Sequence, residues 1–351
     1  MKVLVVSDFF LSGQTTHVFD LIQQLVLRQD CKVLAVFGSI HSPKFYSYHA
    51  SILKKHKVPY KIAKTNQALA QIIQNFRPDV IHCHSSTLFD RVKEVAKMAG
   101  IPYVITCHGL GLDRRKYHDA LSEADALIAV GENTARPLRR LFADKIHVIK
   151  NGVDIRKFTP SAKSSIKRVY YVARMEQTKV RALRALARAV RQIPTLELVV
   201  ISDWMPAIDG VTYLPWQTDL AKILSKTNIV AACGRTAREA MAAGNVVLLI
   251  NRRYDGIVSP DLVSKSDFDF SGNIGRYPLL QIGNDLRKLI NDKELMLSLQ
   301  EFSKNYARKH LDSADMAAKV YEVYASVVKN KGAPKSPLIH KLRVSGWGLK
   351  I

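Results

Sequence analysis

The segment NIVAACGRTAREAMAAGNVVLLIN, residues 228–251, decides the fold. It begins with an apolar run (228–233), passes into a short helical pattern (238–244) and returns to a second apolar run (245–251). Apolar strands joined by a helix indicate a parallel sheet that is covered on both faces. Gly244 is a suitable helix end. This stretch therefore predicts one βαβ unit of an α/β protein.

The same alternation extends through the rest of the chain. Strands are expected at 3–8, 31–39, 80–85, 102–109, 167–174 and 196–203, and helices at 16–29, 68–79, 90–99, 180–193 and 219–227. The join lies near 151–165, which carries Gly, Pro and Ser and little periodicity. We expect two Rossmann-like domains with an interdomain cleft. They comprise 1–158 and 159–312, followed by a terminal helix (313–328) and a basic amphipathic tail (329–351).

Composition limits the classes of partner. The 351 residues suit two domains of about 150 residues each. The net charge of +23 favours nucleic acid, an anionic membrane surface or an acidic substrate as partner, and the excess is spread over both halves. Four scattered cysteines indicate reduced thiols. With neither a signal peptide nor a membrane span expected, the prediction is a cytoplasmic protein.

The start of the helix after 228–233 is the first candidate site. Gly234, Arg235 and Thr236 open its first turn, where free amide groups and the helix dipole favour a phosphate. Glu239 follows about one turn later, where a carboxylate can bind a ribose diol. The alternative is an ordinary crossover helix without a ligand.

Two further cations suit the same ligand. Arg174 ends a predicted strand, and Lys179 follows in the loop before the next helix. Such a pair beyond a strand end suits a diphosphate that gains charge as its bond to a sugar breaks. The alternative is solvated surface charge.

The first half offers weaker signals. Gly13 lies in the loop between the first strand and helix, where it permits close backbone approach, and His108 follows a strand. A histidine there can act as an electrophile, a proton donor or a hydrogen-bond anchor, or be purely structural. The run His82-Cys83-His84 does not chelate as a unit, because alternate strand residues face opposite sides, so we expect no metal.

These segments resemble a known family in order and spacing across about residues 1–328. The matching pieces are SDFFLSGQTTHVFDL (7–21), DVIHCHS (79–85), IPYVITCHGL (101–110), SEADALIAVGENTA (122–135), IKNGVDIRKFTP (149–160), ARMEQTK (173–179) and REAMAAGNVV (238–247). The chain is similar to the retaining glycosyltransferases of family 4, which have the GT-B fold.

The resemblance implies roles for single residues. His108 resembles the active-site histidine that contacts the donor sugar, and Arg174 and Lys179 resemble the diphosphate clamp. Glu239 resembles the second acid of the E-x7-E motif, which holds the ribose. Gly13 resembles the second glycine of a Gly-Gly loop, with Ser12 in the first position.

One departure concerns the first acid of E-x7-E. Counting back eight residues from Glu239 gives Ala231, which cannot accept a hydrogen bond from a sugar. Glu132 does not substitute by spacing. Donor recognition therefore differs, or activity is lost. Arg235 is a candidate contact for the diphosphate or for the carboxylate of an acidic sugar.

The resemblance implies a metal-independent hexosyltransferase without a cofactor. It would move a sugar from a nucleotide-diphosphate donor to a lipid-linked or cell-envelope glycan, such as lipopolysaccharide, with 1–158 on the acceptor side. The basic tail predicts peripheral contact with the anionic inner face of the cell membrane. One alternative is a sugar-nucleotide epimerase of the same fold. Another is a basic nucleic-acid-binding protein, although no nucleic-acid module is recognised.

Overall fold

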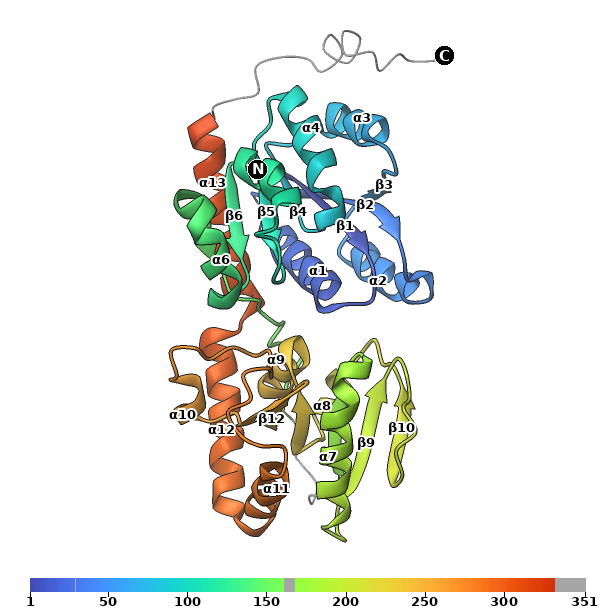
Figure 1. Cartoon of the computed structure of the whole chain (residues 1–351). Helices are drawn as coiled ribbons and strands as arrows, with labels where there is room; N and C mark the ends of the chain where they lie inside the picture. Colours follow the sequence, from blue (N-terminus) through green and yellow to red (C-terminus); the bar gives the residue numbers. More distant parts are fainter. Residues whose placement is uncertain (29, 161–167, 332–351) are drawn as a thin grey trace. The chain divides into compact units, whose positions relative to one another are not determined.

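The computed structural model describes residues 1–28, 30–160 and 168–331, and it confirms the predicted α/β fold class. The chain forms two compact units. Among the described residues, unit 1 consists of Met1–Asn151 and Ser313–Lys331, and unit 2 lies within Gly152–Asp312 (Figure 1).

The sheet of unit 1 has seven parallel strands in the order β3-β2-β1-β4-β5-β6-β7. They are β1 (Lys2–Phe9), β2 (Lys32–Ile40), β3 (Tyr60–Ile62), β4 (Val80–Cys83), β5 (Tyr103–Cys107), β6 (Ala126–Ala129) and β7 (Ile146–Val148). The strand order reverses direction between β1 and β4, and ligands of open α/β sheets bind beyond the strand ends at such a point.

Helices cover both faces of this sheet. They are α1 (Gly13–Val26), α2 (Pro43–Lys55), α3 (Asn66–Phe76), α4 (Phe89–Ala99), α5 (His118–Glu123), α6 (Glu132–Phe142) and α13 (Ser313–Lys331). Apolar side chains of α1, α2 and α13 form one core with the sheet, and those of α3, α4 and α5 form the other. Burial of both strand faces explains the continuous apolar runs in the sequence.

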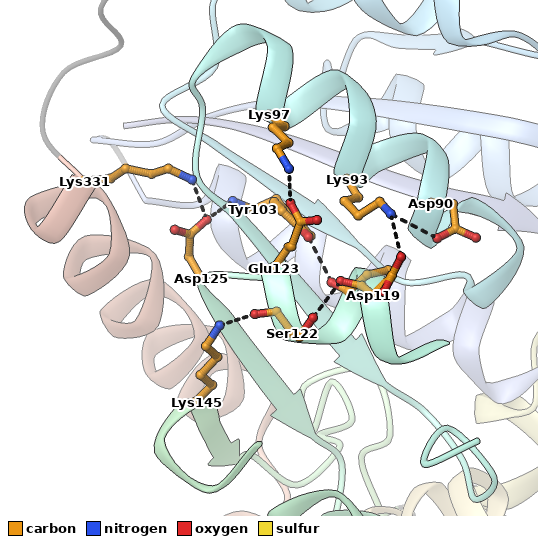
Figure 2. Close-up of polar contacts among 11 residues, drawn as sticks. Asp90, Lys93, Lys97, Tyr103, Asp119, Ser122, Glu123, Asp125, Lys145 and Lys331 are labelled. Atoms are coloured by element: carbon orange, nitrogen blue, oxygen red, sulfur yellow. Dashed lines mark hydrogen bonds and ion pairs between the residues drawn. The ribbon is translucent and has the colours of Figure 1, made fainter. Parts of the chain in front are cut away.

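The terminal helix α13 belongs to unit 1 although it follows unit 2 in the chain. It packs on α1, and Val320 and Tyr324 lie in the core beneath it. At its end, Lys331 Nζ donates a 2.9 Å hydrogen bond to Asp125, whose carboxylate also accepts the amide of Tyr103 at 2.8 Å (Figure 2). Asp125 and Tyr103 lie at the amino ends of β6 and β5, so these contacts anchor the C-terminal end of α13 at that edge of the sheet.

The sheet of unit 2 has the order β10-β9-β8-β11-β12-β13. Its strands are β8 (Arg168–Val172), β9 (Glu197–Ser202), β10 (Val211–Pro215), β11 (Ile229–Ala232), β12 (Val246–Ile250) and β13 (Tyr254–Ile257). The strands predicted in this unit, β8, β9, β11 and β12, are parallel as expected, and β13, which was not predicted, runs antiparallel to β12. Only three residues separate these strands, and a connection this short joins antiparallel neighbours.

Six helices are described in unit 2. They are α7 (Val180–Arg191), α8 (Ala221–Leu224), α9 (Gly234–Ala242), α10 (Pro260–Val263), α11 (Gln281–Asn291) and α12 (Lys293–His310). The helix predicted at 238–244 begins four residues earlier, at Gly234, and the one predicted at 16–29 begins at Gly13. Ser12 sets the latter start, because its side chain accepts a 3.3 Å hydrogen bond from the amide of Thr15.

The expected boundaries shift at two places. Residues 152–158, assigned from sequence to the first domain, belong to unit 2, where Val153 N donates to Leu311 O at 2.8 Å and Phe158 is buried. The predicted tail begins at 329, but residues 329–331 continue α13, and 332–351 lie outside the described residues. Within the described part of the chain, no helix is long and apolar enough to cross a membrane.

Candidate functional site

Unit 2 gathers its predicted site residues at one edge of its sheet. Its strand order reverses between β8 and β11, which lie side by side. Arg174 follows the carboxyl end of β8, and Gly234 follows that of β11. The fold thus brings both predicted phosphate contacts to the position where such sheets bind ligands.

Lys179 and Arg174 are joined through the backbone. Lys179 lies in a short 3-10 turn before α7, its side chain is only 11% exposed, and its Nζ donates a 2.8 Å hydrogen bond to the carbonyl of Arg174. The Arg174 side chain is 47% exposed. One cation is therefore fixed in place, and the other remains accessible to a ligand.

The carboxylate of Glu176 lies within 4 Å of three cationic side chains. Glu176 lies 3.5 Å from Arg174, 3.8 Å from Lys179 and 3.7 Å from Arg252. Sequence reasoning missed Arg252, because it lies in the turn between β12 and β13, far along the chain and outside any motif. Three cations converging on one acidic group form the kind of arrangement that binds a diphosphate.

The first turn of α9 already uses one of its amide groups in a hydrogen bond within the protein. Gly234 adopts a φ of +58°, which glycine accommodates without strain, and its amide donates a 2.6 Å hydrogen bond to Phe270 O. Thr236 lies half-buried in the same turn. The amide of Gly234 is therefore not available to a phosphate, in contrast to the expected free first turn.

Arg235 and Glu239 form a close pair on α9. Arg235 Nε donates a 2.7 Å hydrogen bond to Glu239 Oε1, and its Nη1 lies 3.4 Å from Gly152 O. Glu239 is buried, with 7% of its surface exposed. The acid expected at a ribose is thus oriented by the arginine that was expected at a phosphate or sugar carboxylate.

Arg238 adds a half-buried charge that was not predicted from the sequence. Its guanidinium lies 4.6 Å from the centre of the Phe270 ring, and burial, together with neighbouring Arg235, lowers its pKa to about 10. Burial raises the pKa of the Cys233 thiol, an effect opposed by the charges of Lys179 and Arg238. Arg238 itself belongs to α9, one residue before Glu239.

Ala231 occupies the position of the missing acid. It lies inside β11, between β8 and β12, and is fully buried. A side chain at this position faces the protein core and cannot reach a ligand. The strand that holds position 231 therefore offers no ligand contact there.

In unit 1 the carboxyl ends of β4 and β5 carry His84 and His108, and both rings approach His17 of α1. His84 Nδ1 and His108 Nε2 lie 3.0 Å apart. Candidate ligating nitrogens of all three imidazoles lie within 4.8 Å of one another. Sequence reasoning missed His17, because nothing local on α1 distinguishes it from a core residue.

Burial favours the neutral form of His84 and His108. It lowers the pKa of His108 to about 3 and that of His84 well below the usual value, and the other histidines of the cluster lower the pKa of His84 further. A neutral imidazole offers one donor and one acceptor nitrogen. His108 keeps part of its surface exposed, so it can hydrogen-bond a ligand without carrying charge.

His82 packs against the histidine cluster through the ring of His84. Its Nδ1 lies 2.6 Å from the Tyr324 hydroxyl and its Nε2 lies 2.7 Å from the Thr106 hydroxyl, and its ring centre is 4.0 Å from that of His84. The predicted placement of His82 and His84 on one side of the strand agrees with this contact. Through Tyr324, α13 becomes part of the support.

The loop around Gly13 is tied to the same region. Gly13 is the exposed first residue of α1, and Gln14 Nε2 donates a 2.8 Å hydrogen bond to Ser85 Oγ, just beyond β4. The Ser85 hydroxyl also accepts the amide of Asp8 at 2.8 Å. Ser12 replaces the first glycine of the usual pair and caps the helix instead.

Comparison with known proteins agrees with this architecture. Residues 11–157 match the family model described as Glycosyltransferase Family 4. Comparison with curated protein sequences gives no significant match.

Solved structures match nearly the whole chain. Anabaena HepE, in complex with UDP and glucose, is 15% identical, with a TM-score of 0.70 over 93% of this chain and 100% of that one. A glycosyltransferase from Rickettsia africae is 15% identical, with a TM-score of 0.73 over 94% and 99%. The lipopolysaccharide outer core galactosyltransferase WaaB, in its apo form, is 14% identical, with a TM-score of 0.59 over 93% and 99%. The chain thus has the GT-B fold and resembles the family 4 glycosyltransferases, whose model its residues 11–157 match.

Proposed function

We propose that the chain transfers a sugar from a nucleoside-diphosphate sugar to an acceptor hydroxyl. One observation carries the proposal: Arg174, Lys179 and the start of α9 lie together at the reversal point of the unit 2 sheet. Their charge would stabilise the diphosphate as it leaves the sugar, which is the role a metal ion has in other transferases. Metal independence at the diphosphate is part of the proposal.

The proposed donor is a UDP-sugar, with a hexose as the transferred group. HepE, a structural neighbour, has been solved with UDP-glucose. In this chain Glu239 would bind the ribose, and Arg174, Lys179 and Arg235 would contribute charge near the phosphates. The loss of the first acid at Ala231 would change how the sugar is held.

His108 is the proposed active-site residue of unit 1. Its pKa is lowered to about 3, so it would meet the sugar as a neutral hydrogen-bond partner and not as a cation. The resemblance implies transfer with retention of anomeric configuration. Gly13, the first residue of α1, would line the same end of unit 1.

The proposed acceptor is an envelope glycan or lipid-linked sugar at an anionic membrane surface. The net charge of +23 supports this, and so does a shallow hollow between α2 and β3 that is lined by Lys54, Lys57 and Lys61. Tyr60 and Ile62 are exposed beside these lysines, which suits contact with headgroups and acyl chains. WaaB, by its name, acts on lipopolysaccharide outer core.

The test is a screen of UDP- and GDP-sugars with the full-length chain. Calorimetry would identify the nucleotide, and mass spectrometry of membrane-fraction acceptors would identify a product heavier by one sugar. The Lys179→Ala variant should weaken both signals. A free epimerised sugar nucleotide as the sole product would overturn transfer in favour of epimerisation, and tight salt-dependent binding of plain duplex with no sugar nucleotide bound would overturn both.

A further inference from the structure

Unit 1 contains a cluster of three histidines, of which the proposed sugar transfer uses only His108. His17 comes from α1, while His84 and His108 follow β4 and β5. Candidate ligating nitrogens of the three lie within 4.8 Å of one another. Three different elements of the fold thus bring the three imidazoles together. His82 and Cys83, which precede His84 in the chain, are not members of this cluster.

The chemistry of the cluster suits a metal ion. His84 is 2% exposed, and its Nδ1 lies 3.0 Å from His108 Nε2, so these two nitrogens face each other within the cluster. Imidazole nitrogen is a common zinc ligand, and it binds the ion in its neutral form.

The spacing is also close to what a metal needs. Zinc binds imidazole nitrogen at about 2.0–2.1 Å in a tetrahedral arrangement, which places two ligating nitrogens roughly 3.3 Å apart. His84 Nδ1 and His108 Nε2 are 3.0 Å apart, so a few tenths of an ångström of side-chain movement would admit the ion between them. Imidazole ligands favour zinc and its neighbours over magnesium or calcium.

We propose that His17, His84 and His108 bind one Zn²⁺ through one nitrogen each, with the fourth tetrahedral position open toward the exposed side of His108. The site is independent of the nucleotide site proposed for unit 2. Zinc bound there would join α1 to the ends of β4 and β5 and so stabilise unit 1.

Cobalt provides a direct probe. Full-length protein stripped with chelator should bind one equivalent of Co²⁺ and develop the visible absorption of a tetrahedral site, and Zn²⁺ should abolish it. X-ray absorption of the zinc-loaded parent should show imidazole scattering from about three ligands near 2.0 Å. Zinc should raise the melting temperature.

Single variants assign the ligands. His17→Gln, His84→Gln and His108→Gln should each weaken Co²⁺ binding by well over about tenfold, because loss of an outer contact alone costs 10–100-fold. His56→Gln, at a histidine of unit 1 outside the cluster, should bind as the parent does. A far-ultraviolet circular dichroism spectrum like that of the parent would show that each variant is folded.

Three results would each overturn the proposal. They are the absence of tetrahedral cobalt absorption, X-ray absorption spectra of the zinc-loaded protein without imidazole scattering, and unchanged Co²⁺ binding in all three variants. The spectroscopic test uses the parent protein, so it stands even if a variant fails to fold. Failure of nucleotide binding with an intact cobalt spectrum would overturn the proposed transferase function and leave the zinc site standing.

Discussion

Arg235 Nε donates a 2.7 Å hydrogen bond to the carboxylate of Glu239 one turn further along α9. Both side chains are largely buried, at 13% and 9% exposure. A buried pair of this kind fixes the direction of each group, and removal of one partner leaves the other uncompensated. The proposed ribose contact and the proposed phosphate contact are therefore coupled.

Replacement of Glu239 by Gln should separate nucleoside binding from phosphate binding. The amide keeps the shape but removes the charge that is proposed to hold the ribose diol. UDP affinity should fall by about 1.5–3 kcal/mol in calorimetry, the scale of a charged hydrogen bond. Affinity for inorganic pyrophosphate should fall less, because the amide oxygen of Gln can still accept the hydrogen bond from Arg235 Nε. Glu301→Gln, at an exposed position on α12, is the control and should leave both affinities unchanged. Equal loss of both ligands would show a general defect of the site.

Replacement of Lys179 by Ala should weaken UDP and pyrophosphate alike. The ammonium is held by Arg174 O at 2.8 Å, and its loss removes a fixed positive charge from the proposed diphosphate contact. We expect a loss of about 1.5–3 kcal/mol for each ligand. Lys226→Ala is the matched control, because Lys226 is an exposed residue before the amino end of β11. Unchanged affinity in Lys179→Ala would remove Lys179 from the site.

Restoring the family acid at position 231 should fail. Ala231 is fully buried within β11, so Ala231→Glu would place a carboxylate in the apolar core. The free energy of unfolding should drop by about 3–5 kcal/mol in a urea titration, or the carboxylate should be protonated. Ala314→Glu, at an exposed position in the first turn of α13, should cost little. A stable Ala231→Glu protein with improved donor binding would contradict this placement.

The buried histidines should make unit 1 sensitive to acid. Burial and the nearby His108 lower the pKa of His82 to about 3, whereas an unfolded histidine titrates near 6.5. Below about pH 6.5 the unfolded chain binds more protons than the folded chain, so stability is full above that pH and declines as pH falls toward 3. From about pH 7.5 to about 5.5, His82 should contribute a loss of about 1.4 kcal/mol.

Urea unfolding at these two pH values checks the histidine effect. In His82→Gln the loss of stability on acidification should be smaller than in the parent by about that amount. His41→Gln, at an exposed histidine, serves as the control. An unchanged pH difference in His82→Gln would show that His82 is protonated in the folded protein.

Removal of residues 332–351 should weaken membrane binding. This segment contains Lys335, Lys341, Arg343 and Lys350 with no acid, and it lies outside the described residues. The full chain should cosediment with phosphatidylglycerol vesicles and poorly with neutral ones. Raising salt from about 0.1 to 1 M should release it, because the screening length falls from roughly 10 to 3 Å. UDP affinity should be unaffected by the deletion. Binding that ignored lipid charge would contradict the electrostatic proposal.

Features that depend on neighbouring residues could be predicted from the sequence. The alternation of apolar runs and helical patterns determined both α/β sheets, because periodicity is written in neighbouring residues. The placement of Arg174 and Gly234 beyond strand ends also followed, since the carboxyl ends of parallel strands share one edge. The pairing of Arg235 with Glu239 is an i,i+4 contact on one helix, although its consequence for the site became visible only in the structure.

Other features depended on contacts between distant segments. Tyr324 reaches His82 across 242 residues, which assigns α13 to unit 1, and Arg252 joins Glu176 only because β12 and β13 turn back at that edge. His17, His84 and His108 meet because α1 packs beside the ends of β4 and β5. The sequence by itself determined the elements and the local chemistry of each strand end. Tertiary structure decided which side chains meet, because strand order and helix packing bring together residues that are distant in the sequence. The residues around each of them do not indicate its partner.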